Sequence, residues 1–157
     1  MSANTVDSDG ITYRRILFCT DFSANADHAF LFALASAKRS SAAQLHILHV
    51  LPEPEAEFWR TYLYEIDDVD AKATADINRK IEESYLRQVY GAVETVVAVR
   101  KGQAEEEILT YAKQVGAQLL VIGRQGSRTG LHLFGAVTEK IARKAECPVL
   151  IVPFDAG

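Results

Sequence analysis

Five short apolar runs alternate along the chain with segments of helical periodicity, and this alternation limits the possible folds more than any other feature. The runs are rich in Val, Ile and Leu and are mostly apolar on both faces, which is typical of parallel strands covered by helices on each side. They occupy residues 16–19, 45–50, 93–99, 119–122 and 149–152. The pattern predicts an α/β fold with a five-stranded parallel sheet.

The segments between the runs carry apolar residues at helical spacing. Ser23 is placed to cap a first helix, whose apolar face is rich in alanine. A long helix is expected over residues 70–89, because every fourth residue from position 73 onward is apolar or aromatic. A third helix begins near residue 104 and ends at Gly116, and the last is expected around residues 137–145.

Parallel strands joined by right-handed crossovers form a doubly wound, Rossmann-like sheet, and ligands bind outside the carboxyl ends of its strands. Two of these ends carry unusual residues: Thr20 and Asp21 follow the first run, and Gly123 follows the fourth. We therefore expect a single domain in which strands one and four are neighbours, in the order 3-2-1-4-5. Asp21 would suit a ribose hydroxyl, or it simply starts a turn, and the pattern alone leaves both interpretations open.

A glycine-rich stretch follows the fourth run and leads into the last helix. Because glycine lacks a Cβ atom, backbone N–H groups and a helix amino terminus can approach an anion closely there. The stretch contains four glycines and two arginines: Gly123, Gly126, Gly130, Gly135, Arg124 and Arg128. This composition predicts an anion site, and the alternative is a surface loop that uses glycine for turns.

Neither of the two common phosphate-binding motifs is present. Gly130 and Gly135 have the glycine spacing of a P-loop, but Ala136 and Val137 stand where that motif needs Lys and Ser or Thr. The chain also lacks the G-x-G-x-x-G fingerprint of dinucleotide-binding folds. An anion at this loop would therefore be bound in another way.

Size and charge narrow the functional class. A chain of 157 residues can bury a core as one domain, and we expect residues 1–13 to be a polar lead-in to a domain over 14–157. A net charge of −4 argues against a nucleic-acid partner, which usually requires a basic face. Residues 1–10 lack the apolar core of a signal peptide, and no apolar run approaches the ~20 residues of a membrane span. We expect a cytoplasmic protein without a membrane partner.

Cysteine and histidine usage indicates neither a disulfide nor a metal site. Cys19 and Cys147 lie beside different strands, so we expect buried, unreactive thiols. The four histidines show no spacing typical of metal ligands.

Residues 51–70 differ from the rest of the chain. They contain seven acidic residues, one arginine and four aromatic residues, without a clear strand or helix period. The stretch is either a solvated connection whose aromatic side chains fold back on the core or a surface for a partner, because exposed aromatic residues are common at interfaces.

Taken together, these residues resemble the universal stress protein family from about Arg15 to Val152. Five stretches carry the resemblance, in order along the chain: residues 16–23 (ILFCTDFS), 48–50 (LHV), 100–104 (RKGQA), 137–141 (VTEKI) and 147–152 (CPVLIV). Each is weakly specific alone, but together they cover one whole domain.

Members of this family that bind ATP carry the pattern G-x2-G-x9-G-[S/T]. Gly123 and Gly126 match its first two glycines, whereas only eight residues separate Gly126 from Gly135, and Ala136 replaces the hydroxyl residue. The resemblance implies that a Ser at position 136 would cap the last helix, with Gly135 as a substitute cap here. The shorter loop would weaken triphosphate binding more than binding of adenine and ribose.

The resemblance implies an adenine nucleotide, ATP or AMP, with Mg²⁺ accompanying the phosphates. Asp21 would meet the ribose or adenine, Val50 the adenine through its backbone, and the glycines the phosphates. The residues expected at the site are Thr20, Asp21, Val50, Gly123, Arg124, Gly126, Arg128, Gly130, Gly135, Ala136 and Val137. Residues 149–152 should form an edge strand that pairs with a second copy in a homodimer.

Three functions are compatible with these residues. The first is a stress-response regulator that binds an adenine nucleotide between strands one and four. The second is a nucleotide-free, dimeric interaction module of the same family. The third, an adenylyl-transferring enzyme, is disfavoured because the sequence shows no paired nucleophile and base.

Overall fold

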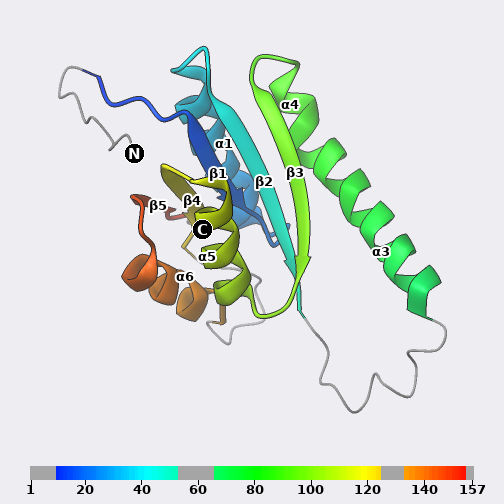
Figure 1. Ribbon diagram of the computed structural model, residues 1–157. Coiled ribbons are helices and arrows are strands. Elements are labelled where there is room, and N and C mark those ends of the chain that lie inside the picture. Colours follow the sequence, from blue (N-terminus) through cyan, green and yellow to red (C-terminus); the bar gives the residue numbers. More distant parts are fainter. Residues whose placement is uncertain (1–9, 53–65, 125–132, 155–157) are drawn as a thin grey trace.

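The computed structural model describes residues 10–52, 66–124 and 133–154, and its centre is a five-stranded parallel sheet (Figure 1). The strand order is β3-β2-β1-β4-β5, which confirms the order predicted from the strand ends. The strands are β1 (Arg15–Cys19), β2 (Gln44–Leu51), β3 (Glu94–Lys101), β4 (Leu119–Gly123) and β5 (Val149–Val152). The chain order reverses between β1 and β4, which is where ligands bind in sheets of this type.

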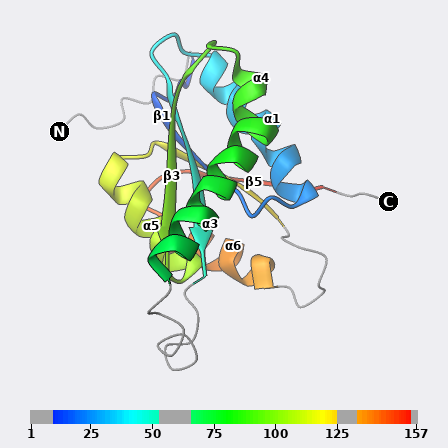
Figure 2. The ribbon, with the colours of Figure 1, turned by 90° about the vertical axis from the view of Figure 1, so that its right-hand side faces the viewer.

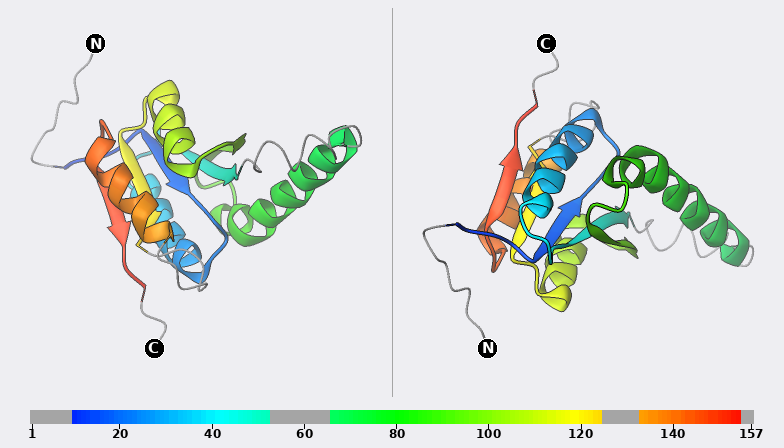
Figure 3. Two further views of the ribbon diagram at one scale, coloured as in Figure 1. Left: turned by 90° about the horizontal axis from the view of Figure 1, so that it is seen from below. Right: turned by 90° about the horizontal axis from the view of Figure 1, so that it is seen from above.

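Helices cover both faces of the sheet (Figures 2 and 3). One face packs against α1 (Ala24–Lys38) and α3 (Ile66–Ile81), and the other against α5 (Ala104–Val115) and α6 (Leu133–Lys144). Within β1, Ile16 and Phe18 belong to the first core and Leu17 and Cys19 to the second. Successive side chains therefore alternate between two hydrophobic cores, one on each face of the sheet. This explains why the strand sequences are apolar throughout.

The expected helix ends are confirmed at two positions. The Ser23 hydroxyl accepts a hydrogen bond from the backbone N–H of Ala26 at 3.1 Å and so caps α1. Gly116 ends α5 in the left-handed region, with φ +65° and ψ +45°, where a Cβ atom would be unfavourable. No helix in the described ranges is long and apolar enough to cross a membrane.

The long helix expected over 70–89 differs from an ideal α-helix. It begins earlier, at Ile66, and is interrupted by a π-helical turn, η2 (Glu82–Leu86), before α4 (Arg87–Val89). A strict four-residue repeat drifts around an α-helix by ~40° per step, because one turn takes 3.6 residues. The wider π turn, with its i→i+5 bonds, offsets this drift and keeps Ile81, Tyr85 and Val89 buried on one face.

The amino-terminal half of α3 projects beyond the sheet, past β3 (Figures 1 and 3). Ile77 and Ile81, in its second half, are buried. Residues 53–65, which include most of the acidic aromatic stretch, lie outside the described residues, so neither interpretation of that stretch is tested.

Both cysteines are free thiols, as expected, with Cys19 buried and Cys147 half-buried. Burial raises the pKa of both thiols above the ordinary value, so neither is a reactive thiolate at neutral pH.

Candidate functional site

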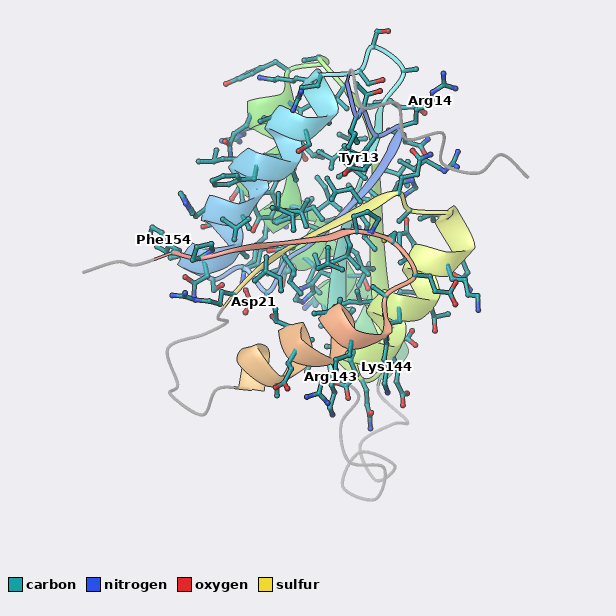
Figure 4. The ribbon with its side chains drawn as sticks, turned by 90° about the vertical axis from the view of Figure 1, so that its left-hand side faces the viewer. Tyr13, Arg14, Asp21, Arg143, Lys144 and Phe154 are labelled. Carbon is teal, nitrogen blue, oxygen red and sulfur yellow. The ribbon has the colours of Figure 1, made fainter. Side chains whose placement is uncertain are left out.

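The strand register brings the predicted site residues to one edge of the sheet. Cys19 of β1 pairs with Leu48 of β2, and the same register continued by two residues places Asp21 beside Val50. β1 also pairs with β4, up to Phe18 and Val121, and Arg124 follows the carboxyl end of that neighbouring strand. Figure 4 shows Asp21 between the start of α1 and α6. The carboxyl ends of β1, β2 and β4 thus lie side by side at the point where the strand order reverses, which is where ligands bind in sheets of this type.

Asp21 has a structural role in the turn that follows β1. Its Oδ1 atom accepts a hydrogen bond from the backbone N–H of Ser23 at 3.0 Å, which is the bond of an Asx turn. The interpretation of Asp21 as a turn residue is therefore correct. A carboxylate has two oxygens, so this bond does not exclude a second role for Oδ2 toward a ligand.

The next residue, Phe22, has a backbone conformation that is rare outside glycine. Its φ is +61°, in the left-handed region, which costs about 1–3 kcal/mol for a residue of this kind. The backbone N–H of Phe22 donates to the Thr20 hydroxyl at 2.9 Å. That hydroxyl is buried and also bonds the Tyr85 phenol, which in turn donates to Asp27 of α1 at 2.7 Å. The Thr20 hydroxyl therefore makes its hydrogen bonds inside the protein and is not directed to a ligand.

His49 of β2 lies against the same turn. Its Nδ1 atom is 2.8 Å from the carbonyl oxygen of Thr20, and because a carbonyl only accepts, Nδ1 carries the proton and donates. Its ring lies 4.7 Å from that of Phe22. Burial lowers the pKa of His49, opposed by its hydrogen bond to Thr20 and by the charge of Asp21. His49 is therefore a neutral ring that fixes the end of β1.

The two described glycines of the loop pattern have different surroundings. A Cβ atom on Gly123 would lie 3.1 Å from the backbone carbon and oxygen of Asn25, so this glycine allows the first turn of α1 to approach β4. Among the described residues, a Cβ atom on Gly135 would meet nothing within 4 Å, so these residues leave the space beside it open. The open space is at Gly135, where a phosphate could approach the backbone, whereas Gly123 is needed for packing.

The start of α6 corrects one sequence-based expectation. The helix begins at Leu133, so Gly135, Ala136 and Val137 lie inside its first turns and Gly135 is not its cap. The expectation that Gly135 caps the helix at position 136 is wrong, because the helical turn begins earlier than the family pattern implies. Thr138 donates from its buried hydroxyl to the carbonyl oxygen of Gly123 at 3.2 Å. This bond fixes the first turns of α6 beside the end of β4.

Eight of the eleven predicted site residues lie in the described part of the chain, and three do not. The eight gather at the carboxyl edge: Thr20, Asp21, Val50, Gly123, Arg124, Gly135, Ala136 and Val137. Gly126, Arg128 and Gly130 fall outside the described residues. The exposed Arg124 donates its backbone N–H to Val152 of β5 at 2.9 Å. Among the described residues, no three His, Cys, Asp or Glu side chains are grouped to hold a metal ion.

Sequence analysis missed the polar contacts that hold this edge together. Tyr85 was expected only as an apolar member of a helix face, and His49 and Thr138 were given no role at the site. A phenol hydroxyl or an imidazole leaves no mark in hydrophobic periodicity, so the sequence offered no signal for these bonds.

A cavity of about 420 Å³ lies at the opposite, amino edge of the sheet. Its lining includes Arg15, Lys113, Gln118, Lys144 and Cys147, from the starts of β1 and β4 and the ends of α5 and α6. The lysines sit in the last turns of their helices, where a positive charge offsets the negative end of the helix dipole. The helix dipoles alone therefore explain why lysines occur at this edge. We place the candidate site at the carboxyl edge instead.

Comparison with known proteins agrees with the fold. The model of the universal stress protein family matches residues 12–153. The chain belongs to the universal stress protein family. This universal stress protein is 28% identical to universal stress protein MJ0577 of Methanocaldococcus jannaschii, over 90% of this chain and 96% of the relative. It is 34% identical to a putative universal stress protein of Staphylococcus epidermidis, over 90% and 85% of the two chains.

Solved universal stress protein structures share the fold. The structure of MJ0577 superposes with a TM-score of 0.79 at 23% identity, covering 94% of this chain and all of the other. A universal stress protein in complex with cAMP has a TM-score of 0.59 at 24% identity, covering 90% and 98% of the two chains. A family member from Arabidopsis thaliana with AMP bound has a TM-score of 0.60 at 20% identity, covering 91% and 93%. At these identities the superpositions establish the fold.

Proposed function

We propose that this universal stress protein is a stress-response regulator that binds an adenine nucleotide, ATP or AMP, at the carboxyl edge of its sheet. The observation that carries the proposal is the gathering of Asp21, Val50 and the open first turn of α6 around the β1–β4 reversal point. Backbone and side-chain groups of three strands and one helix converge there, which is the usual composition of a small-molecule site.

Each part of the proposed site suits one part of a nucleotide. The second oxygen of the Asp21 carboxylate, Oδ2, would accept hydrogen bonds from ribose hydroxyls, and the backbone of Val50 would meet the adenine. The amino terminus of α6 presents N–H groups and a positive dipole end to phosphates, and Gly135 leaves room for them. Arg124, exposed at the end of β4, is placed to add charge.

The cAMP and AMP complexes of the two related structures support the choice of an adenine nucleotide. In this chain eight residues separate Gly126 from Gly135, and Ala136 supplies no hydroxyl. Both differences concern the phosphates rather than the base and ribose. Discrimination between ATP and AMP should therefore be modest, and any Mg²⁺ would be held by the phosphates.

Calorimetric titration of the purified protein with ATP and with AMP tests the proposal. We expect saturable binding of both nucleotides at one site, with affinities within about tenfold of each other, a difference of ~1.4 kcal/mol. If the folded protein binds neither nucleotide at millimolar concentration, the alternative of a nucleotide-free interaction module takes the place of this proposal.

We also propose that the protein is a homodimer that pairs through β5. This strand lies at an edge of the sheet, and Val149, Leu150 and Ile151 are only half-buried. The exposed side chains of Leu31 and Phe32 lie on α1, which packs against β5. An apolar edge strand flanked by exposed apolar residues favours pairing with a second copy.

Replacing Ile151 by Lys should convert the dimer into a monomer, because a charge would then be buried between the paired strands. Sedimentation velocity measures the change. Val96→Lys is the matched control, since Val96 is a half-buried residue of β3 at the other edge of the sheet. A wild-type monomer, or an unchanged dimer in Ile151→Lys, would count against this interface.

A further inference from the structure

We propose that Tyr85 is a positioning residue for the nucleotide site: its phenol holds the end of β1 in the conformation that presents Asp21 to the ligand. The inference rests on the proposed nucleotide-binding function and adds to it a residue from η2, an element that contributes none of the predicted site residues. It is carried by the hydrogen bonds around Tyr85 and by the backbone conformation of Phe22.

These hydrogen bonds form a chain whose direction is fixed. The single proton of the Tyr85 phenol is donated to Oδ1 of Asp27 at 2.7 Å. The Thr20 hydroxyl must therefore donate to the phenol oxygen, and its own oxygen accepts the backbone N–H of Phe22 at 2.9 Å. Burial raises the pKa of Tyr85, so the phenol keeps its proton at neutral pH. Every member of this chain has its partner, which is the condition for a buried polar network to be rigid.

The chain ends at the most strained residue of the site. Phe22 is held at φ +61° by the bond from its N–H to Thr20, and Asp21 directly precedes it. The Phe22 ring also packs against the Tyr85 ring, with centroids 6.2 Å apart and planes within 16°. Without the phenol, the Thr20 hydroxyl would be free to rotate and the unfavourable conformation of Phe22 would lose support. Asp21 would then sample orientations that do not suit a ligand.

The π-helical turn is what brings Tyr85 to this position. The turn lies between α3 and α4, and Tyr85 is its one buried residue, with an exposed fraction of 0%. Its ring contacts those of Phe18 and Phe30 at centroid distances of 5.2 and 4.8 Å. The ring therefore serves the core and the hydroxyl serves the turn after β1. Packing alone would be satisfied by phenylalanine, so the hydroxyl needs a separate explanation.

Tyr85→Phe separates the two roles, because it keeps the ring and removes only the hydroxyl. Tyr111→Phe is the matched control: Tyr111 is also buried, and its phenol bonds Nδ1 of His46 at 2.8 Å on the other face of the sheet. Tyr85→Phe loses two hydrogen bonds and Tyr111→Phe loses one, so both variants should be less stable than wild type, with the larger loss in Tyr85→Phe. We expect Tyr85→Phe to weaken AMP binding by ~5- to 10-fold, through a lower population of the binding-competent conformation, and Tyr111→Phe to leave it unchanged.

Amide hydrogen exchange supplies a readout that does not depend on the nucleotide. In Tyr85→Phe the Phe22 amide should exchange at least several-fold faster than in wild type, at equal exchange in the centre of the sheet. Wild-type AMP affinity in Tyr85→Phe, or equal losses in both variants, would overturn the inference while leaving the proposed function intact. If the wild type itself binds no AMP, the proposed function fails and the positioning role fails with it. Should Tyr85→Phe not fold, Thr20→Val removes the central hydroxyl of the same chain and must show the same two effects.

Discussion

Replacing Gly123 by Ala is expected to destabilise the protein by about 1–3 kcal/mol, as an overpacked core position does. The added Cβ atom would lie 3.1 Å from two backbone atoms of Asn25, and a backbone in the first turn of α1 cannot move aside as a flexible side chain can. The change would also push the first turn of α1 away from β4. The expected loss is large because the contact is between main chains.

Gly135→Ala is the matched control and should change stability in the opposite direction. Its Cβ atom would meet nothing within 4 Å, and the residue lies in α6, where alanine is favoured over glycine by about 0.5–1 kcal/mol. The same substitution narrows the space proposed for phosphates, so it should weaken ATP binding more than AMP binding. Urea unfolding measures the stabilities of both variants. Equal stability changes in the two variants would contradict this account of the glycines.

Asp21→Ala is expected to weaken binding of ATP and AMP by similar factors, about 10- to 100-fold, the value of a hydrogen bond to a charged group. The factors should agree because the ribose is common to both nucleotides. Part of the loss would come from the turn, since Ala cannot accept the hydrogen bond from the Ser23 N–H.

Asp21→Asn separates these two contributions. Its amide oxygen can still accept the bond from Ser23, so the turn is kept, but the second carboxylate oxygen is replaced by a donor. Calorimetry should therefore show that Asp21→Asn keeps near wild-type stability. Its affinity for both nucleotides should nevertheless be lower than that of the wild type. Wild-type affinity in Asp21→Asn would mean that Asp21 serves the turn alone.

The sheet and its strand order could be predicted from the sequence for a physical reason. Parallel strands buried on both faces must be apolar throughout, and the chain shows five such runs separated by helical segments. The reversal point followed from the residues at two strand ends, Asp21 and Gly123. The bounds of β3 were shifted by one or two residues, because Arg100 and Lys101 continue the strand despite their charge.

The details of the site could not be predicted in the same way. The role of Gly123 depends on the backbone of Asn25, a contact between separate elements that the sequence does not record. A glycine that admits a helix and a glycine that admits a phosphate look alike in a sequence. The hydroxyl of Tyr85 and the early start of α6 were missed because periodicity and family spacing describe faces of helices, not hydrogen bonds or first turns.

Mapping AMP binding by amide chemical shifts in the ¹⁵N-labelled protein tests most directly whether the nucleotide binds at the carboxyl edge of the sheet. We expect saturable shifts at Asp21, Val50 and Gly123 and in the first turns of α6, with the amino edge of the sheet unchanged. Shifts confined to the lining of the amino-edge cavity, at Gln118 and Cys147, would place the ligand at the amino edge and contradict the proposed site. So would a spectrum that does not change at millimolar AMP.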